Sequence, residues 1–373
     1  MKEIKDILRA YFLATKAGKK TALATVVKVE GSSYRQPGAR MLVSEDGELT
    51  GAISGGCLEG DALRKALLAI NQQQNKLITY DTSNEDDIEF GVQLGCNGIV
   101  HILFEYIDSA KNNNPIELLQ QLEKERKDAV IITLFSHNRN SLQPGTVLFD
   151  RASAILKANN PYAILSSYSK EVLENKTSII KKVEFKNTSY EALIDYIAPP
   201  ISLVICGAGN DVKPLVEMTS LLGWETIVVD GRATHATAIR FPKATAVSIA
   251  KPEEVLNNVS VDDRKFFVLI THNYKYDLAM LKFLILTDCV YIGILGPKTK
   301  LNRMLDDLKD NGIVLTEKQL NRIYGPVGLD IGAETSEEIA LSIVSEIKAV
   351  ISGKEGLSLK YKKEKIHPVT MVV

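Results

Sequence analysis

The stretch Val204-Ile205-Cys206-Gly207-Ala208-Gly209 determines the fold that we predict for the second half of this chain. Its apolar residues predict a buried β-strand, and the Gly-Ala-Gly turn after them predicts a direct passage into a helix. In this context the first glycine permits the tight turn, and the second lets a pyrophosphate approach the backbone. The N-terminus of the helix offers free N–H groups and the positive end of its dipole to phosphates. The stretch therefore predicts a nucleotide-binding, Rossmann-like domain of the α/β class.

Some residues after this turn support the prediction of a dinucleotide site, and one argues against it. Asp230 ends the next predicted strand, 23 residues after Gly207, where a carboxylate can hydrogen-bond a ribose hydroxyl. Arg232 lies two residues further on and is placed for a 2′-phosphate, although an arginine in a loop is more often a solvated charge. The third glycine position holds Val212, which alters the packing of the helix against the strand. Ligand binding is favoured, and a vestigial turn in a purely structural domain is the alternative.

Strands and helices alternate through the second domain, which we predict to span residues 199–352. The predicted strands cover 201–206, 225–230, 244–248, 266–271 and 290–295. The predicted helices lie near 210–222, 252–257, 276–286, 298–311 and 335–351. This alternation is typical of a parallel sheet covered on both faces. His272 follows the fourth strand and is therefore expected at the carboxyl edge of the sheet, as a ligand-binding residue or as a hydrogen-bonded structural one.

A first domain of mixed α+β character precedes the stiff Pro199-Pro200 junction and spans residues 1–198. Its pattern predicts helices over 3–15 and 57–70 and strands over 21–29, 77–80 and 99–107. A weak echo suggests that residues 20–108 are duplicated in 128–198, because two short motifs recur: Gln36-Pro37-Gly38 as Gln143-Pro144-Gly145, and Phe104-Glu105-Tyr106-Ile107 as Ile194-Asp195-Tyr196-Ile197. The second copy lacks the Gly-Gly-Cys turn and its helix, and coincidence stays open. Residues 353–373 form a lysine-rich tail.

Two cysteines of the first domain lie in glycine-rich turns and are candidates for chemistry. Cys57 follows Gly55 and Gly56 and opens a predicted helix, whose dipole lowers the pKa of a thiol. Cys96 lies in a second turn of this kind, at 91–98. A thiolate can be a soft metal ligand, a nucleophile or a sulfur carrier, and the alternative is a small buried residue beside tight turns. Two further cysteines are expected in the core: Cys206 and Cys289.

The composition is that of an ordinary globular protein with no strong charge. The chain has 373 residues, 45% hydrophobic and 24% charged, and this length predicts two domains. A net charge of −1 gives no long-range attraction to nucleic acid or to a membrane surface. No signal peptide or membrane-spanning run is evident, and four cysteines are too few for a disulfide framework. We therefore expect a cytoplasmic protein with reduced thiols.

Taken together, these motifs resemble the XdhC/CoxI family, the accessory factors of xanthine dehydrogenase and related molybdenum hydroxylases. The resemblance covers nearly the whole chain. In the first domain it rests on three blocks, which are Gly31-Ser32-Ser33-Tyr34-Arg35-Gln36-Pro37-Gly38-Ala39-Arg40-Met41, Ser54-Gly55-Gly56-Cys57-Leu58-Glu59-Gly60 and Leu94-Gly95-Cys96-Asn97-Gly98. In the second domain the most specific block is Gly325-Pro326-Val327-Gly328-Leu329-Asp330-Ile331-Gly332-Ala333-Glu334-Thr335. Two positions depart from the family pattern: Asn210, where His is common, and Asn273, where Asp is common.

The resemblance implies a cofactor chaperone more than an enzyme with turnover of its own. Such a factor binds molybdenum cofactor transiently, supports its sulfuration and passes it to an apo-hydroxylase, with a cysteine desulfurase as a further partner and a homodimer as the expected assembly. The resemblance further implies that Cys57, Cys96 and Glu59 handle sulfur or metal, and that Cys57 contacts molybdenum. The predicted cofactor-binding residues are Gly55, Gly56, Cys57, Gly207, Ala208, Gly209, Asn210, Asp230, Arg232 and His272. The alternative function is an NAD(P)-dependent oxidoreductase, in which the Rossmann-like domain holds the nicotinamide cofactor.

Overall fold

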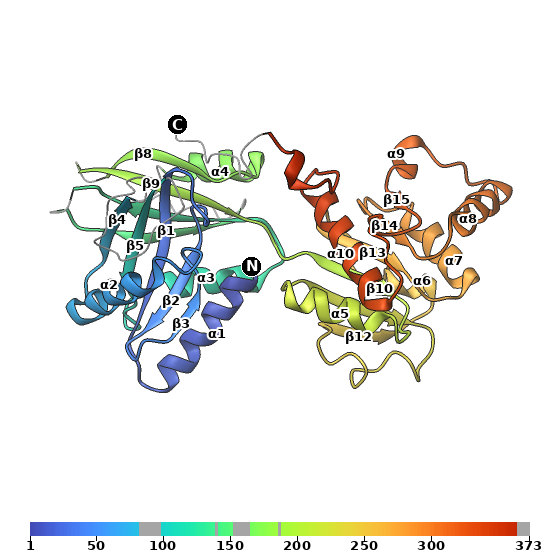
Figure 1. Cartoon of the computed structure of the whole chain (residues 1–373), viewed down its shortest axis with the longest axis horizontal. Helices are drawn as coiled ribbons and strands as arrows, with labels where there is room; N and C mark the ends of the chain where they lie inside the picture. Colours follow the sequence, from blue (N-terminus) through green and yellow to red (C-terminus); the bar gives the residue numbers. More distant parts are fainter. Residues whose placement is uncertain (82–97, 139–140, 152–164, 186–187, 364–373) are drawn as a thin grey trace. The chain divides into compact units, whose positions relative to one another are not determined.

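The computed structural model of the chain describes residues 1–81, 98–138, 141–151, 165–185 and 188–363 (Figure 1). It divides into two compact units between Pro199 and Pro200. We call the part up to Pro199 the first unit and the described part from Pro200 onward the second unit. Within the described ranges, no helix has the length and apolar character that crossing a bilayer requires.

The first half of the first unit is an antiparallel sheet with helices. Its elements in chain order are α1 (Lys2–Lys16), β1 (Thr21–Gly31), β2 (Arg40–Ser44), β3 (Leu49–Gly51), α2 (Glu59–Gln72), β4 (Lys76–Asp81) and β5 (Gly98–Tyr106). The strands lie in the order β3-β2-β1-β5-β4. The apolar residues of α2 and of one sheet face form one core cluster, so this helix covers that face.

The second half of the first unit repeats this arrangement. Its elements are α3 (Pro115–Lys124), β6 (Ala129–Phe135), β7 (Gly145–Asp150), α4 (Ser166–Asn175), β8 (Ile179–Phe185) and β9 (Thr188–Ile197). The strand order β7-β6-β9-β8 has the same sequence of neighbours as β2-β1-β5-β4. The helix α4 has the same place in the chain order as α2 in the first half, so the expectation of a lost helix is wrong. The pattern concealed this helix because only Ser169 and Val172 in it are buried.

The two halves contact each other through matching positions. A Cβ atom on Gly38 would lie 2.7 Å from a carboxylate oxygen of Asp195, and one on Gly145 would lie 2.3 Å from a carboxylate oxygen of Glu105. Each glycine of a Gln-Pro-Gly motif therefore packs on the carboxylate of the other half's closing strand. The backbone N–H that follows each carboxylate in sequence is also matched, because Tyr106 donates to Asn75 and Tyr196 donates to Ser178.

The second unit is built on a parallel sheet, as predicted, and this sheet has six strands. They are β10 (Ser202–Cys206), β11 (Glu225–Asp230), β12 (Ala246–Ile249), β13 (Lys265–Leu269), β14 (Ile292–Ile294) and β15 (Ile323–Tyr324). They lie in the order β12-β11-β10-β13-β14-β15, the strand order of dinucleotide-binding domains. The short edge strand β15 escaped prediction because two residues carry no periodicity.

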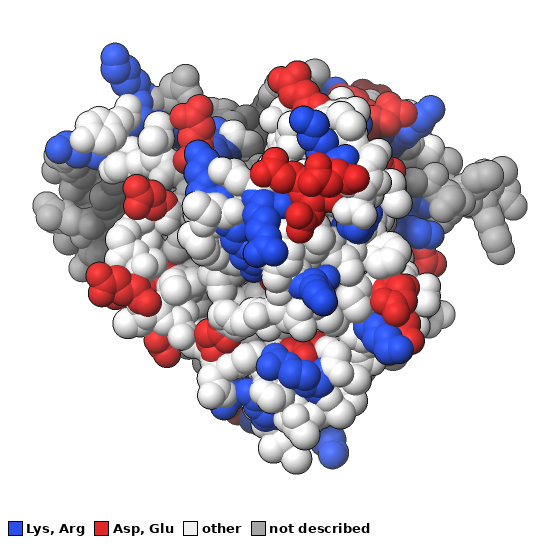
Figure 2. Space-filling view, turned by 90° about the vertical axis from the view of Figure 1, so that its right-hand side faces the viewer, with Lys and Arg blue, Asp and Glu red and all other residues white. Residues whose placement is uncertain are grey.

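Helices cover both faces of this sheet (Figure 1). They are α5 (Val212–Leu221), α6 (Pro252–Val255), α7 (Tyr274–Leu284), α8 (Lys298–Asp310), α9 (Glu317–Leu320) and α10 (Ser336–Ile351), with a short 3₁₀ helix at Leu359–Tyr361. Apolar residues of α5 and α10 join one core cluster, and those of α7 and α8 join another. On the face of the molecule in Figure 2, acidic and basic side chains lie in small groups among uncharged ones, and neither sign covers the whole face.

Candidate functional site at the carboxyl edge of the parallel sheet

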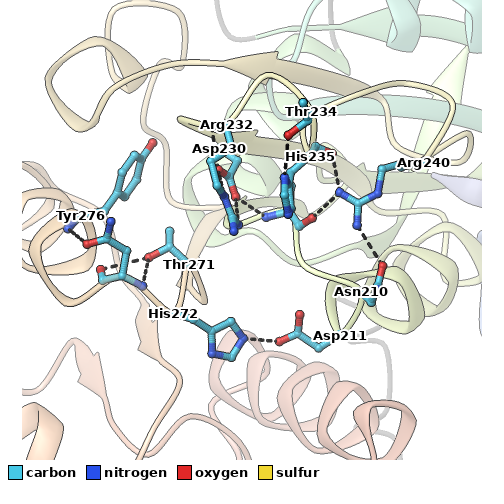
Figure 3. A network of polar contacts seen from close by, with 12 residues as sticks. Asn210, Asp211, Asp230, Arg232, Thr234, His235, Arg240, Thr271, His272 and Tyr276 are labelled. Atoms are coloured by element: carbon cyan, nitrogen blue, oxygen red, sulfur yellow. Dashed lines mark hydrogen bonds and ion pairs between the residues drawn. The ribbon is translucent and has the colours of Figure 1, made fainter.

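The carboxyl edge of the parallel sheet gathers the predicted ligand-binding residues of the second unit. The central strand β10 pairs with β11 on one side and with β13 on the other. The chain crosses over in opposite directions from β10, so the loops after these strands part at this point and leave a crevice for ligands. Figure 3 shows the side chains that these loops bring together.

The backbone geometry of the turn after β10 requires a glycine at position 207, and at position 209 a side chain would displace the carboxylate of Asp211. Gly207 has a φ of +134°, and a Cβ atom there would lie 2.3 Å from the carbonyl oxygen of Ile270. A Cβ atom on Gly209 would lie 2.2 Å from Oδ1 of Asp211. Val212 replaces the third glycine and is fully buried in the core beneath α5. The turn thus keeps the tight backbone of a phosphate-binding loop, with a valine where closer helix packing is usual.

Asp230 is held by four N–H donors at the end of β11. Its Oδ1 accepts from the backbone N and the Nε of Arg232, both at 2.9 Å. Its Oδ2 accepts from the backbone N of Ala208 at 2.8 Å and from Nη2 of Arg232 at 2.7 Å. Burial opposes ionisation of this carboxyl, but the hydrogen bonds from Arg232 and Ala208 outweigh it and hold its pKa below the ordinary value.

A second arginine, Arg240, fixes the outer side of the glycine turn. Its Nη1 donates to the carbonyl oxygens of Ala208 and His235, both at 2.8 Å, and its Nη2 donates to Oδ1 of Asn210 at 3.0 Å. Asn210, which departs from the family pattern, therefore serves as an acceptor for this arginine. Arg240 was not among the predicted site residues.

His272 and Asp211 approach each other from the loops after β13 and β10. Nε2 of His272 lies 2.7 Å from Oδ2 of Asp211, and the imidazole side chain is 63% exposed. His272 has a φ of +56°, an uncommon backbone conformation for a non-glycine residue. Such a conformation costs free energy, and it places the ring at the edge of the crevice. Asp211 was not among the predicted site residues.

A buried network supports the loop that carries His272. Oδ1 of Asp277 accepts from Oγ1 of Thr271 at 2.5 Å, and Oδ2 accepts from Nζ of Lys300 at 2.7 Å. Lys300 also donates to the carbonyl oxygen of Leu295 at 2.8 Å, so it ties the loop after β14 to the loop after β13. No local pattern predicted this network, because an aspartate and a lysine on two helices look like ordinary surface residues until they are packed together.

In the first unit, the turn before α2 is organised around Ser54. Its Oγ accepts from the backbone N of Gly56 and of Leu58, both at 3.1 Å, and it donates to the carboxylate of Glu59. The other carboxylate oxygen of Glu59 accepts from the Ser54 backbone N at 2.9 Å. Glu59 therefore closes the turn, and Cys57 stands partly exposed between these two residues.

The remaining cysteine candidates differ in what the structure says of them. Cys96 lies outside the described residues. Cys206 and Cys289 are buried as predicted, and burial raises the pKa of both thiols, to about 11 for Cys289. Among the described residues, no group of three or more His, Cys, Asp or Glu side chains could hold a metal ion.

A polar cavity of the first unit was missed by sequence reasoning. It has a volume of about 880 Å³ and includes His137, Thr79 and Gln143 in its lining, but no described residue of the Cys57 turn. His137 is hydrogen-bonded to Glu191 at 3.1 Å and stacks edge-on against His101. These residues come from separate strands and loops, so no local sequence motif predicts the cavity that they line.

Both parts of the chain match known family descriptions. Residues 203–347 match the XdhC Rossmann domain, and residues 14–81 match the XdhC and CoxI family. The chain is 32% identical over 325 residues to a probable xanthine dehydrogenase component of Bacillus subtilis (strain 168), covering 87% of this chain and 91% of the relative. It is 23% identical over 349 residues to the "Molybdenum cofactor insertion chaperone PaoD" of Escherichia coli (strain K12), covering 93% of this chain and 88% of that protein.

A solved structure has the same fold over nearly its whole length. It is a crystal structure described as a xanthine dehydrogenase from Bacillus halodurans, with a TM-score of 0.74 and 30% sequence identity. The similarity covers 96% of this chain and 98% of that chain.

Proposed function

The chain belongs to the XdhC and CoxI family, and from this premise we propose that it is an accessory factor that binds molybdenum cofactor as cargo and delivers it to a xanthine dehydrogenase-type hydroxylase. The full-length similarity to a molybdenum cofactor insertion chaperone supports this proposal. We further propose that the factor supports the sulfuration of the cofactor, with a cysteine desulfurase as the sulfur source. A cytoplasmic homodimer is the form in which we expect the factor to act.

The observation that carries the proposal is the arrangement of donors at the carboxyl edge of the second unit. The cargo is a pterin with a phosphate and a dithiolene. The N-terminus of α5 offers backbone N–H groups and a positive dipole end, and the guanidinium groups of Arg232 and Arg240 flank the glycine turn before it. Arginine and a helix N-terminus together suit the phosphate of such a cargo.

The partly exposed thiol of Cys57 is the proposed residue for sulfur or metal. It lies in a turn whose backbone is fixed by Ser54 and Glu59, so its position does not depend on a flexible loop. Both carboxylate oxygens of Glu59 are engaged inside the turn, and we therefore assign Glu59 to holding Cys57 in place.

Co-expression with a partner hydroxylase, in a host without its own accessory factor, tests both sites. We expect the purified wild-type factor to carry molybdenum and pterin, measured by metal analysis and by fluorescence of the oxidised pterin. Arg240→Ala should lose most of this cargo because the glycine turn loses a cation and the hydrogen bonds that Arg240 donates to Ala208 and Asn210, and the link to His235 is lost as well. Cys57→Ala should keep the cargo but leave the hydroxylase inactive, because sulfur is not supplied.

Lys243→Ala is the matched control for loss of a positive charge. Lys243 lies close to Arg240 in sequence and pairs with Glu217 at the surface, outside the glycine turn. The Lys243→Ala variant should retain the cargo and should still activate the hydroxylase. Full activation by Cys57→Ala would remove the thiol from the proposal, and a wild-type factor without molybdenum or pterin would contradict the chaperone function.

A second candidate function is an NAD(P)-dependent oxidoreductase. The strand order β12-β11-β10-β13-β14-β15 favours it, because that order is typical of dinucleotide-binding domains. The residues fit the nicotinamide cofactor poorly at one point, since the carboxylate of Asp230 is already filled by Arg232 and Ala208. Titration with NADH and NADPH followed by a reductase assay separates this function from the first.

A further inference from the structure

We propose that Arg232 selects the ligand of the second unit: it withholds Asp230 from a ribose and offers a guanidinium to a phosphate in its place. The carboxyl edge of this sheet is thereby specific for a phosphate-bearing ligand without an adenosine ribose at that position. The inference rests on the proposed function in one respect, namely that the cargo binds the edge through its phosphate.

The two carboxylate oxygens of Asp230 have little acceptor capacity left for a ligand. A carboxylate has two oxygens with about four lone-pair positions in total. In this protein four N–H groups already donate to them, three from Arg232 and one from Ala208, at 2.7 to 2.9 Å. The hydroxyls of a ribose would need positions on the same two oxygens. A ribose can therefore bind Asp230 only after Arg232 has been displaced.

Arg232 is held firmly by Asp230. Its backbone N and its Nε both donate hydrogen bonds to Oδ1 of Asp230, so the main chain and the side chain of Arg232 bind the same atom. Nη2 of Arg232 donates to Oδ2 of Asp230 and, together with the bond from Nε, completes a bidentate contact. This is the strongest geometry for an arginine and a carboxylate. The carboxylate is 4% exposed, so water competes weakly for it.

The bound arginine still presents part of its guanidinium to a ligand. Nε and Nη2 face Asp230, which leaves Nη1 for a ligand, and the side chain is 49% exposed. Ala208 N and Nη2 donate to the same oxygen, so the guanidinium stands directly beside the glycine turn (Figure 3). A phosphate at the N-terminus of α5 is thus within the field of a fixed cation.

The same geometry argues against the 2′-phosphate of NADP(H). A phosphate on the ribose could contact Arg232, but the ribose that carries it would still meet the carboxylate of Asp230, whose oxygens already accept from Arg232 and Ala208. The arginine therefore does not convert the site from NAD(H) to NADP(H), and it disfavours both.

Titration of the full-length protein with NADH tests whether Arg232 keeps a ribose away from Asp230. Binding is monitored through the fluorescence of the nicotinamide. Arg232→Ala removes the two side-chain donors of Arg232 from the carboxylate, while the backbone donors of residue 232 and Ala208 remain. We expect this variant to bind NADH about tenfold more tightly than the wild type, as one or two new hydrogen bonds predict. The double variant Arg232→Ala/Asp230→Ala should lose this gain. NADPH should show no comparable gain, and Lys243→Ala should bind NADH like the wild type.

Calorimetric titration with inorganic pyrophosphate tests the phosphate half. We expect Arg232→Ala to bind pyrophosphate several-fold more weakly than the wild type, while Arg232→Lys, which keeps the charge, falls between them. Arg232→Gln is measured beside Arg232→Ala, with thermal unfolding as a check, so that a folding defect in one variant is recognised.

Two results would overturn the proposal. One is an NADH affinity that is unchanged in both Arg232→Ala and Arg232→Gln, and the other is a gain that persists in the double variant. Neither titration uses molybdenum cofactor, so the selection by Arg232 can hold even if the factor proves to carry no cargo. Conversely, loss of cargo in Arg240→Ala without any effect at Arg232 would leave the proposed function standing alone.

Discussion

His101 on β5 shows how one buried side chain can make the first unit sensitive to pH. Its Nδ1 lies 2.9 Å from Oγ1 of Thr79 and its Nε2 lies 3.3 Å from Oε1 of Glu30. Burial is the main cause that lowers the pKa of this imidazole, followed by the neighbouring His137; Lys28 lowers it further, and Glu30 acts in the opposite direction. The folded state therefore prefers the neutral ring.

We predict that acid destabilises the first unit through His101. In the unfolded chain a histidine titrates near pH 6.5. Because the folded pKa is lower, the stabilising contribution is present above that value and is lost as the pH falls through the folded pKa. His101→Gln, which keeps a polar group for Thr79, should flatten the fall in unfolding free energy between about pH 7 and pH 5.

Urea unfolding at a series of pH values measures how steeply the unfolding free energy depends on pH. His235→Gln is the control, because His235 is a partly exposed residue of the second unit, hydrogen-bonded at its ring only to Thr234 among the described residues. An unchanged slope in His101→Gln would assign the acid sensitivity to other groups.

At the scale of a single element, the turn before α2 depends on one serine. Ser54 satisfies the N–H groups of Gly56 and Leu58 in the turn that precedes the helix and also binds Glu59. Removing the acceptor of such N–H groups costs about 1–2 kcal/mol, because they are left without a partner. The same serine keeps the segment around Cys57 in a fixed conformation.

We predict that Ser54→Ala lowers the unfolding free energy by about 1–2 kcal/mol and speeds the alkylation of Cys57. The second effect follows because the turn opens more often once its central acceptor is lost. The experiment is best done in a Cys96→Ser background, with iodoacetamide and mass spectrometry. Cys206 and Cys289 are buried and serve as internal controls. Equal alkylation rates with and without Ser54 would show that the turn is held by other contacts.

At the scale of the whole molecule, the two halves of the first unit lead us to propose an internal duplication of residues 20–108 in 128–198. The shared strand order and the matched packing of each glycine on the other half's carboxylate support it. Arg40 pairs with Asp195 at 2.9 Å, whereas the corresponding Glu105 binds Thr146, so the two halves have diverged in charge. Burial raises the pKa of Glu105, and the hydrogen bonds from Thr146 and the charge of Arg40 offset this only in part.

We predict that the second unit folds without the first. Its two core clusters consist of residues from Ile201 onward, and its sheet is complete without the first unit. A fragment of residues 200–363 should therefore unfold cooperatively in urea and show helical circular dichroism. A fragment of residues 251–363 lacks the central strand β10 and should not fold. Failure of the longer fragment would show that the units stabilise each other.

Local patterns predicted the second unit well and the first unit in part. The parallel sheet was recognisable because each strand is a buried apolar run and each helix has a regular apolar face, so neighbouring residues carry the signal. The short strand β15 and the helix α4 carried little periodicity and were missed. Two predicted site residues have roles that the sequence did not distinguish: Glu59 closes its turn, and Asn210 accepts a hydrogen bond from Arg240.

The Gly207-Ala208-Gly209 turn, its strand and the carboxylate of Asp230 were predictable from local patterns, because these features depend on residues close together in the chain. The three-dimensional arrangement of the loops was needed to see that Arg232 occupies that carboxylate and that His272 meets Asp211 across the crevice. It also showed Lys300 reaching Asp277 below the loops. The physical reason is that a hydrogen bond has strict distance and angle requirements, whereas the spacing of residues in a sequence does not fix where a side chain ends.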